Sequence, residues 1–310
     1  MLNVTQENVG TLRERPSMKK FTYTLALLLL FKILLVSCGP PLRISEEPIF
    51  LIVRGDDMGM THSCNLAVEK AFRQGILTCV SVIAPSPWFE EAARMCREHP
   101  QWCVGVHLML NSEWRDYRWK PVLPLTEVPS LVDQDGYFHP TTEAFLAASP
   151  SLEEVNKELR AQVDLTLKRK IDVQYIDTHM DTARATPELR EIVVQISRDY
   201  KLPLSRESGE NPLSVYEVPP SQKEKSLAQK LKEIGPGLWL LVIHPGLDTP
   251  EERALVDINP QGLPDVAANR AAVTKAITSK QIKRIIQKRQ IQLTDYRKLQ
   301  KEKTQLKKTP

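Results

Sequence analysis

Residues 50–59 have the sequence FLIVRGDDMG, from which the fold of the chain can be predicted outward. The first five of these residues form a short, mostly apolar run, which is typical of a strand in a parallel sheet that is covered on both faces. Gly55 ends the run, and Asp56 and Asp57 follow at once. Because like charges repel at a buried strand end, such a pair requires a cation or a shared proton. In the alternative interpretation, Asp56 caps a helix and Asp57 is a solvated turn residue.

Strand-like and helix-like segments alternate along the rest of the chain. We expect strands at residues 50–54, 78–84, 103–110, 173–177, 202–206, 238–243 and 291–293. We expect helices at residues 65–74, 88–99, 151–170, 187–200, 222–234 and 268–287. Repeated βα units predict right-handed crossovers around a parallel sheet. Without a dinucleotide-binding glycine motif, the pattern predicts an α/β fold, a distorted (β/α) barrel of about seven strands, rather than an open sheet.

The N-terminal residues have the features of an export signal. Two lysines after Met18 precede the apolar residues 21–36, and the sequence LVSC at 35–38 matches a bacterial lipobox. We therefore predict a signal peptide over 1–38, with Cys38 lipidated, and a tether over 39–49. This predicts an exported, membrane-anchored lipoprotein on the periplasmic or cell-surface side. Lys32 interrupts the apolar run, so an uncleaved anchor is the alternative, and either Met1 or Met18 is the true start.

The folded domain is expected over residues 50–296, with a solvated, charged tail over 297–310. The formal net charge is only +4 and lies largely at the chain ends. No basic face with interleaved aromatic residues is present in the sequence, so nucleic acid is not an expected partner. A homodimer stays an open option.

Four cysteines fall in the folded part: Cys64, Cys79, Cys96 and Cys103. In an exported protein, Cys96 and Cys103 could pair across a short loop. We favour the alternative, in which all four are small, buried, apolar residues.

Residues 111–150 interrupt the alternation with a long segment rich in proline and aromatic residues. A segment of this length is usually functional. Exposed aromatic rings such as Trp114 would stack on a sugar ring, whereas in the alternative they pack on the barrel rim.

Polar residues follow several of the expected strands. Asp56 and Asp57 follow the first strand, and the others are His107, His179, Arg206 and His244. In a parallel barrel all strand carboxyl ends meet on one face, so these residues should converge. One carboxylate and two imidazoles form a three-ligand site with open positions, which is typical of a catalytic metal. Such a metal activates water or polarises a carbonyl group, and a neighbouring carboxylate can accept a proton.

Four motifs occur in the order of a known family. They are DDMG at 56–59 followed by Asn65, GVHL at 105–108, DTH at 177–179 and HPG at 244–246. Together they resemble the YdjC-like carbohydrate deacetylases, which include the chitooligosaccharide deacetylases, over residues 50–296.

The resemblance implies roles for individual residues. Asp57, His107 and His179 would hold one divalent ion, Mg or Zn. Asp56 would be the general base, and His244 an acid or a substrate contact. The implied reaction is hydrolysis of an acetamide on an N-acetylated amino sugar or oligosaccharide, which releases acetate and a free amine.

The chain also departs from the family pattern. Asp181 stands where many members have a second histidine, and Arg54 stands where small residues are common. Arg206 could contact an anionic substrate group or form a salt bridge on the rim.

Two other functions stay open on the sequence alone. A surface lipoprotein could bind glycans without turning them over, through the aromatic segment. A glycosidase with paired carboxylates fits poorly, because its two carboxylates must lie about 5 Å or more apart.

Overall fold

The strand β1, Ile49–Met58, lies at the centre of a parallel sheet of seven strands. The computed structural model describes residues 47–260 and 262–306. The strand order is β4-β3-β2-β1-β6-β5, and β7 also pairs with β1. The other strands are β2 (Cys79–Val82), β3 (Cys103–Leu108), β4 (Val173–Thr178), β5 (Asn211–Leu213), β6 (Gly237–Ile243) and β7 (Gln292–Leu293). The predicted α/β fold with a parallel sheet of about seven strands is confirmed.

The sheet curls into an incomplete barrel. Beyond the edge strand β4, the Ile176 amide donates to the Pro203 carbonyl, and the Ser205 amide donates to the Ile176 carbonyl. The chain then continues to β5 at the other edge of the sheet. The segment 203–213 therefore links the two edges, which leaves a distorted barrel.

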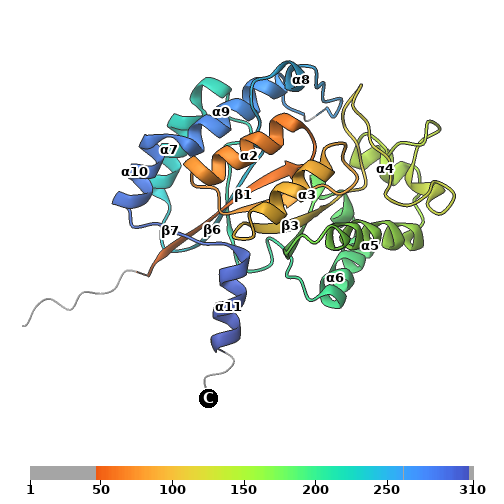
Figure 1. Cartoon of the computed structure of the whole chain (residues 1–310), viewed down its shortest axis with the longest axis horizontal. Coiled ribbons are helices and arrows are strands. Elements are labelled where there is room, and N and C mark those ends of the chain that lie inside the picture. Colours follow the sequence, from red (N-terminus) through yellow and green to blue (C-terminus); the bar gives the residue numbers. More distant parts are fainter. Residues whose placement is uncertain (1–46, 261, 307–310) are drawn as a thin grey trace, which may run out of the picture. The chain divides into compact units, whose positions relative to one another are not determined.

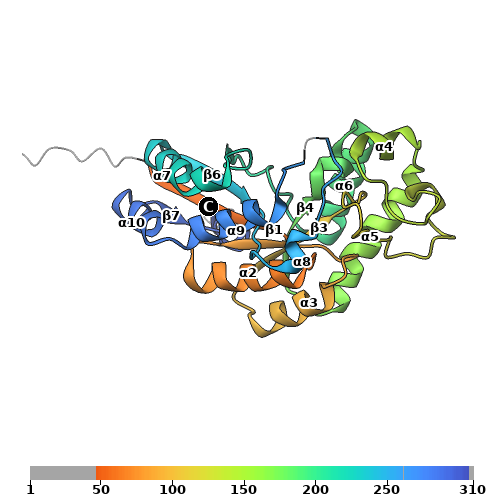
Figure 2. The ribbon, with the colours of Figure 1, turned by 90° about the horizontal axis from the view of Figure 1, so that it is seen from above.

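Helices follow the strands and cover the outside of the barrel (Figures 1 and 2). The longer ones are α2 (His62–Gln74), α3 (Phe89–Glu98), α5 (Leu152–Lys168), α6 (Pro187–Tyr200), α7 (Lys223–Glu233), α9 (Val266–Thr278) and α10 (Lys280–Lys288). Several begin at a side-chain cap: the hydroxyl groups of Thr61, Ser151 and Thr186 each accept an amide hydrogen from the first turn. Among the described residues, no helix has both the length and the apolar character needed to cross a membrane.

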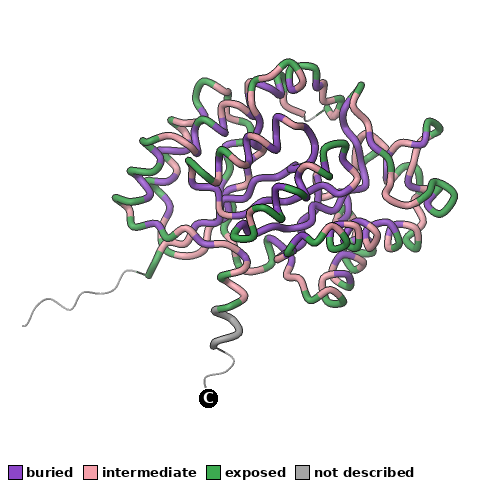
Figure 3. Tube along the Cα trace, in the orientation of Figure 1, coloured by how far each residue is buried: buried purple, intermediate pink, exposed green. Residues whose placement is uncertain are grey.

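Buried residues are concentrated in the central strands (Figure 3). The buried apolar residues form two separate clusters. Successive side chains of a strand point to opposite faces. In β1, Leu51 and Val53 belong to the outer cluster beneath the helices, whereas Ile52 belongs to a smaller cluster inside the barrel. Arg54, two residues after Ile52, also faces the inside of the barrel. The polar residues at the strand ends lie on this same inner side.

Three expectations were wrong in detail. The expected fifth strand, residues 202–206, forms only one bridge, between Leu204 and Ile176, and the fifth strand is instead Asn211–Leu213. The expected helix 268–287 is two helices, because Ser279 is extended and caps α10. The tail expected to be solvated begins as the helix α11, Tyr296–Leu306, whose Arg297 side chain pairs with Asp172.

The four cysteines of the described region are free and buried, as we favoured. Cys96 packs in the outer cluster and Cys103 in the inner one. Because the two thiols lie on opposite sides of the sheet, the alternative disulfide was wrong. Cys38, the predicted tether and the signal lie outside the described residues, apart from residues 47–49.

Gly105 in β3 offers a test of the inner packing. A Cβ atom there would lie 2.4 Å from the Tyr175 ring, whereas nothing lies within 4 Å of one at Gly235. We expect Gly105→Ala to lower the free energy of unfolding by about 1–3 kcal/mol, because an overpacked core must shift. Urea denaturation would measure this loss. Gly235→Ala is the matched control, and equal stability of the two variants would contradict the packing described.

Candidate metal centre

A β-bulge at the end of β1 aims two consecutive carboxylates at one place. The register of β1 against β2 shifts between Gly55 and Met58. Asp57 has a φ angle of 68°, in the left-handed region. In a regular strand Asp56 and Asp57 would face opposite sides of the sheet, but a bulge re-aims a side chain. The bulge therefore allows both aspartates to reach the inner, carboxyl end of the barrel.

Asp57, His107 and His179 converge at this end of the sheet. Asp57 Oδ1 lies 3.5 Å from His107 Nε2 and 3.4 Å from His179 Nδ1, and these two nitrogens are 3.3 Å apart. All three residues are buried. The sequence predicted that these residues meet, and the structure brings them together.

The spacing of these three atoms suits one cation. Around a tetrahedral ion with bonds of about 2.1 Å, neighbouring ligand atoms lie roughly 3.4 Å apart. Asp57 Oδ1 is buried and accepts no hydrogen bond from the described residues. A buried oxygen without a donor is costly unless another partner satisfies it. These residues therefore fit a bound metal ion.

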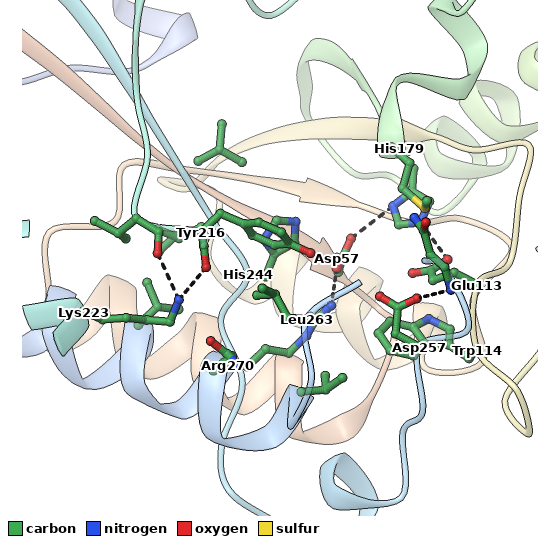
Figure 4. A pocket seen from close by; sticks show the side chains of 18 residues that line it. Asp57, Glu113, Trp114, His179, Tyr216, Lys223, His244, Asp257, Leu263 and Arg270 are labelled. Atoms are coloured by element: carbon green, nitrogen blue, oxygen red, sulfur yellow. Dashed lines mark hydrogen bonds and ion pairs between the residues drawn. The ribbon is translucent and has the colours of Figure 1, made fainter. Parts of the chain in front are cut away.

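Further charged groups hold each of the three ligands in place. Asp177 Oδ2 lies 3.0 Å from His107 Nδ1, and Glu113 Oε2 lies 3.0 Å from His179 Nε2. Carboxylates of this kind orient imidazole ligands and fix which nitrogen faces the metal. Arg270 Nη2 donates to Asp57 Oδ2 over 2.6 Å, which leaves Oδ1 facing the histidines (Figure 4).

Arg54 fills the barrel interior beneath the centre and is 0% exposed. Its Nε and Nη2 each lie 2.7 Å from one oxygen of Asp56, and Nη2 lies 2.8 Å from Asp177. Its Nη1 donates to the Ser205 hydroxyl. Arg54 thus connects the predicted base with the carboxylate that supports His107.

The charged groups around the centre stabilise positive charge there. Burial lowers the pKa of His107, but the carboxylate of Asp56 and its neighbours outweigh it and raise the pKa to about 9. Burial likewise opposes protonation of His179, yet Glu113 and Asp57 hold its pKa well above the usual value. For Asp57, burial favours the neutral acid, but Arg270 reverses this and holds the pKa well below its usual range. The same buried carboxylates would stabilise a bound cation.

His244 follows β6 and lines a cavity with Asp57. Burial lowers the pKa of His244, so its imidazole is neutral near pH 7. Its ring lies edge-on to the Tyr216 ring, with centroids 5.4 Å apart. The geometry therefore places His244 beside the centre, as expected.

Trp114 and Arg206 were both candidates for substrate contacts, Trp114 as an exposed ring and Arg206 as a partner of an anionic group. Trp114 is 2% exposed, so its ring is not an exposed stacking surface, but it does line the smaller of the two cavities at the centre. The Arg270 guanidinium lies 5.7 Å from the centroid of that ring, so Trp114 packs beside the residue that holds Asp57. Arg206 forms the rim salt bridge, 2.6 Å from Asp181, while it also lines the larger cavity described below.

Three residues that support the centre were not predicted from the sequence: Glu113, Asp177 and Arg270. Asp177 lies in the DTH motif, and its position two residues before His179 on an inward face could have indicated it. Glu113 lies in the irregular segment after β3, and Arg270 lies on α9, more than 200 residues from Asp57. No local pattern indicates either contact.

Two cavities open onto the centre. The smaller has a volume of about 100 Å³ and is lined by Asp57, His179 and His244. In the close view, Lys223 lies at the end of this cavity opposite His179 and Glu113 (Figure 4). The larger has a volume of about 620 Å³ and is lined by Asp56 and His107 as well as by His179 and His244.

A curled parallel βα sheet with a carboxylate and two histidines at its carboxyl end defines an α/β barrel protein with a candidate metal centre. A family model described as YdjC-like protein matches residues 50–288, which is more than half of the chain. The chain belongs to the YdjC-like family.

Named relatives support this assignment. A carbohydrate deacetylase of Thermus thermophilus is 34% identical over 235 residues, which cover 67% of this chain and 81% of that protein. A carbohydrate deacetylase of Brevibacillus brevis is 32% identical over 154 residues, which cover 50% of this chain and only 58% of that protein.

A solved structure shares the fold. It is a crystal structure from Enterococcus faecalis V583 that carries the provisional description of a cellobiose-phosphate cleavage protein. The two structures align with a TM-score of 0.67 at 26% identity, and the alignment covers 81% of this chain and 99% of that one.

Arg54 provides a test of the charge network. Arg54→Met would leave Asp56 and Asp177 buried without their cation, so we expect a loss of roughly 3–5 kcal/mol in the free energy of unfolding, measured by urea denaturation. The control is Arg198→Met, which removes an exposed pair with Glu191 and should change stability little. If both variants were equally stable, the network would not have the role described.

Proposed function

We propose that this protein is a metal-dependent hydrolase that removes acetyl groups from N-acetylated amino sugars or their oligosaccharides. The observation that carries the proposal is the convergence of Asp57, His107 and His179 within 3.3–3.5 Å, with Asp56 beside them. Membership of the YdjC-like family supports it, because relatives of this chain are named carbohydrate deacetylases.

The donor set indicates which cation fits. Two imidazole nitrogens and one carboxylate oxygen suit zinc better than magnesium, which prefers oxygen ligands. When bound, such an ion would polarise the amide carbonyl and stabilise the negative charge that develops on its oxygen.

The chain's own groups supply the proton transfers. Asp56 would accept a proton from the attacking water. Arg54 donates one hydrogen bond to each Asp56 oxygen, and a carboxylate has about four lone-pair sites, so acceptor sites remain. The C–N bond breaks as the amine nitrogen takes a proton. The proton that Asp56 takes from the water would pass to the neutral imidazole of His244, which lines the same cavity, and from there to that nitrogen.

The test is acetate release from N-acetylglucosamine and its β-1,4-linked oligomers by the purified protein. We expect release that stops after treatment with a chelator and returns with Zn²⁺. Asp56→Asn should lower kcat by about 10²–10⁴-fold, because it removes the base, while the bound metal is retained. Asp116→Asn, at an exposed surface pair, is the control.

The outcomes separate this proposal from its alternatives. Glycan binding without acetate release, unchanged in Asp56→Asn, would indicate a non-enzymatic binding protein. Formation of new reducing ends would indicate a glycosidase. Either result would contradict the deacetylase proposal.

We also propose that the protein is an exported lipoprotein anchored through Cys38. The proposal rests on the lysines, the apolar run and the lipobox of residues 18–38. In bacterial cells fed a labelled fatty acid, the wild type should carry the label and fractionate with membranes, and Cys38→Ser should lose the label. Labelling that persists in Cys38→Ser would contradict lipidation at this residue.

A further inference from the structure

The candidate metal centre lies where two cavities of different character meet. Asp57 lines only the smaller cavity, Asp56 and His107 line only the larger one, and His179 and His244 line both. A bond that is cut at the centre would therefore have one side in each cavity.

The larger cavity is polar. The residues that only this cavity contacts, beyond Asp56 and His107, are Thr142, Glu143, Thr178, Asp181 and Arg206. Hydroxyl, carboxylate and guanidinium groups can satisfy the hydroxyl groups of a sugar. This cavity thus has the chemistry and, at about 620 Å³, the volume for the amino-sugar side of a substrate.

The smaller cavity has an aliphatic wall. This wall comes from β6, from the start and middle of α9 and from two loops. It consists of Val215, Val242, Ile243, Leu263, Val266 and Val273, of which Val242 also lines the larger cavity. Hydroxyl-rich groups gain little from such a wall, whereas a hydrocarbon chain gains from burial against it.

Two polar side chains at this cavity, those of Lys223 and Asn269, are already engaged with the backbone. Lys223 Nζ donates to the carbonyls of Val215 and Tyr216, over 3.0 and 2.8 Å. Asn269 Nδ2 donates to the carbonyls of Pro264 and Asp265, over 2.8 and 3.1 Å. These contacts reduce the capacity of the two side chains to bind sugar hydroxyls. The other polar residues at this cavity include Glu113, Tyr216, Asp257 and Arg270, and the aliphatic wall lies beside them.

The smaller cavity is also too large for the methyl group of an acetamide alone. A single water-sized group, close to a methyl group in size, needs roughly 15 Å³ of such space. The cavity offers about 100 Å³. Several further carbon atoms could enter without displacing the side chains.

We infer that the smaller cavity is an acyl pocket and that the enzyme removes N-acyl groups longer than acetyl, such as propionyl and butyryl, from amino sugars. This inference rests on the proposed amide hydrolysis and extends its substrate class. The acyl chain lies against Val242 and Val273, and the amino sugar occupies the polar cavity. Water adds to the acyl carbon, the C–N bond breaks, and the products are a short-chain fatty acid and a free amine.

The experiment compares kcat/KM of the Zn²⁺-loaded wild type for N-acetyl-, N-propionyl- and N-butyrylglucosamine, with the released acid quantified. Each added methylene should raise kcat/KM by about 4-fold until the pocket is full. A second measurement uses binding alone: calorimetry with butyrate and acetate should show that butyrate binds several-fold more tightly.

Two variants test the location of the pocket. Val273→Phe should reduce kcat/KM for the butyryl substrate at least 10-fold more than for the acetyl substrate, because the larger side chain fills the cavity. Val273→Ala should shift the preference toward longer chains. Opposite shifts in the two variants would support the assignment even if one of them is less stable.

The experiment distinguishes failure of this inference from failure of the deacetylase proposal. If the wild type releases acetate but cleaves the propionyl and butyryl substrates 10-fold more slowly, this inference is overturned and the deacetylase proposal stands. If no acid is released from any of the three, both are overturned. If both Val273 variants leave the chain-length preference unchanged, the assignment of this cavity is overturned.

Discussion

Buried charge inside the barrel determines which groups can occupy its carboxyl end. Five buried carboxylates lie against the clustered imidazoles or against a guanidinium group of this cluster, and three guanidinium groups pair with them. The carboxylates are Asp56, Asp57, Asp177, Glu113 and Glu252, and the guanidinium groups are those of Arg54, Arg270 and Arg206. This leaves a surplus of two negative charges, which is too costly to bury alone. The raised pKa values of His107 and His179 show the same demand for positive charge, and one divalent cation would meet it.

The backbone determines which side chains enter this cluster. The period of two along each strand sends Arg54, Gly105 and Tyr175 to the inner face of the sheet, below the residues of the centre. Gly105 leaves room for the ring of Tyr175, its register partner on β4. The bulge at the end of β1 breaks the period at one point and thereby adds Asp57 to the same cluster. The centre therefore depends on the regular alternation of side chains along the strands and on the single bulge at the end of β1.

Much of this arrangement could be predicted from the sequence. The alternation of strands and helices indicated a parallel barrel, and the carboxyl ends of such strands meet on one face, so the meeting of Asp57, His107 and His179 followed from topology. The short fifth strand was placed wrongly, because the segment 203–205 contacts β4 through a single bridge. Such an irregular edge leaves no periodic pattern to detect.

The groups that support the centre could not be predicted in the same way. Arg270 reaches Asp57 from a helix that follows it by more than 200 residues, and Glu113 reaches His179 from an irregular segment. Trp114 was considered as an exposed ring, but packing against the rest of the fold buries it. Each of these contacts depends on tertiary packing rather than on local sequence.

The most direct test of the central claim is an anomalous difference map from crystals of the protein grown with Zn²⁺. We predict one strong peak, with bonds of about 2.0–2.2 Å to Asp57 Oδ1, His107 Nε2 and His179 Nδ1. A map with no peak among these three atoms at saturating Zn²⁺, or with the ion bound elsewhere in the barrel, would contradict it.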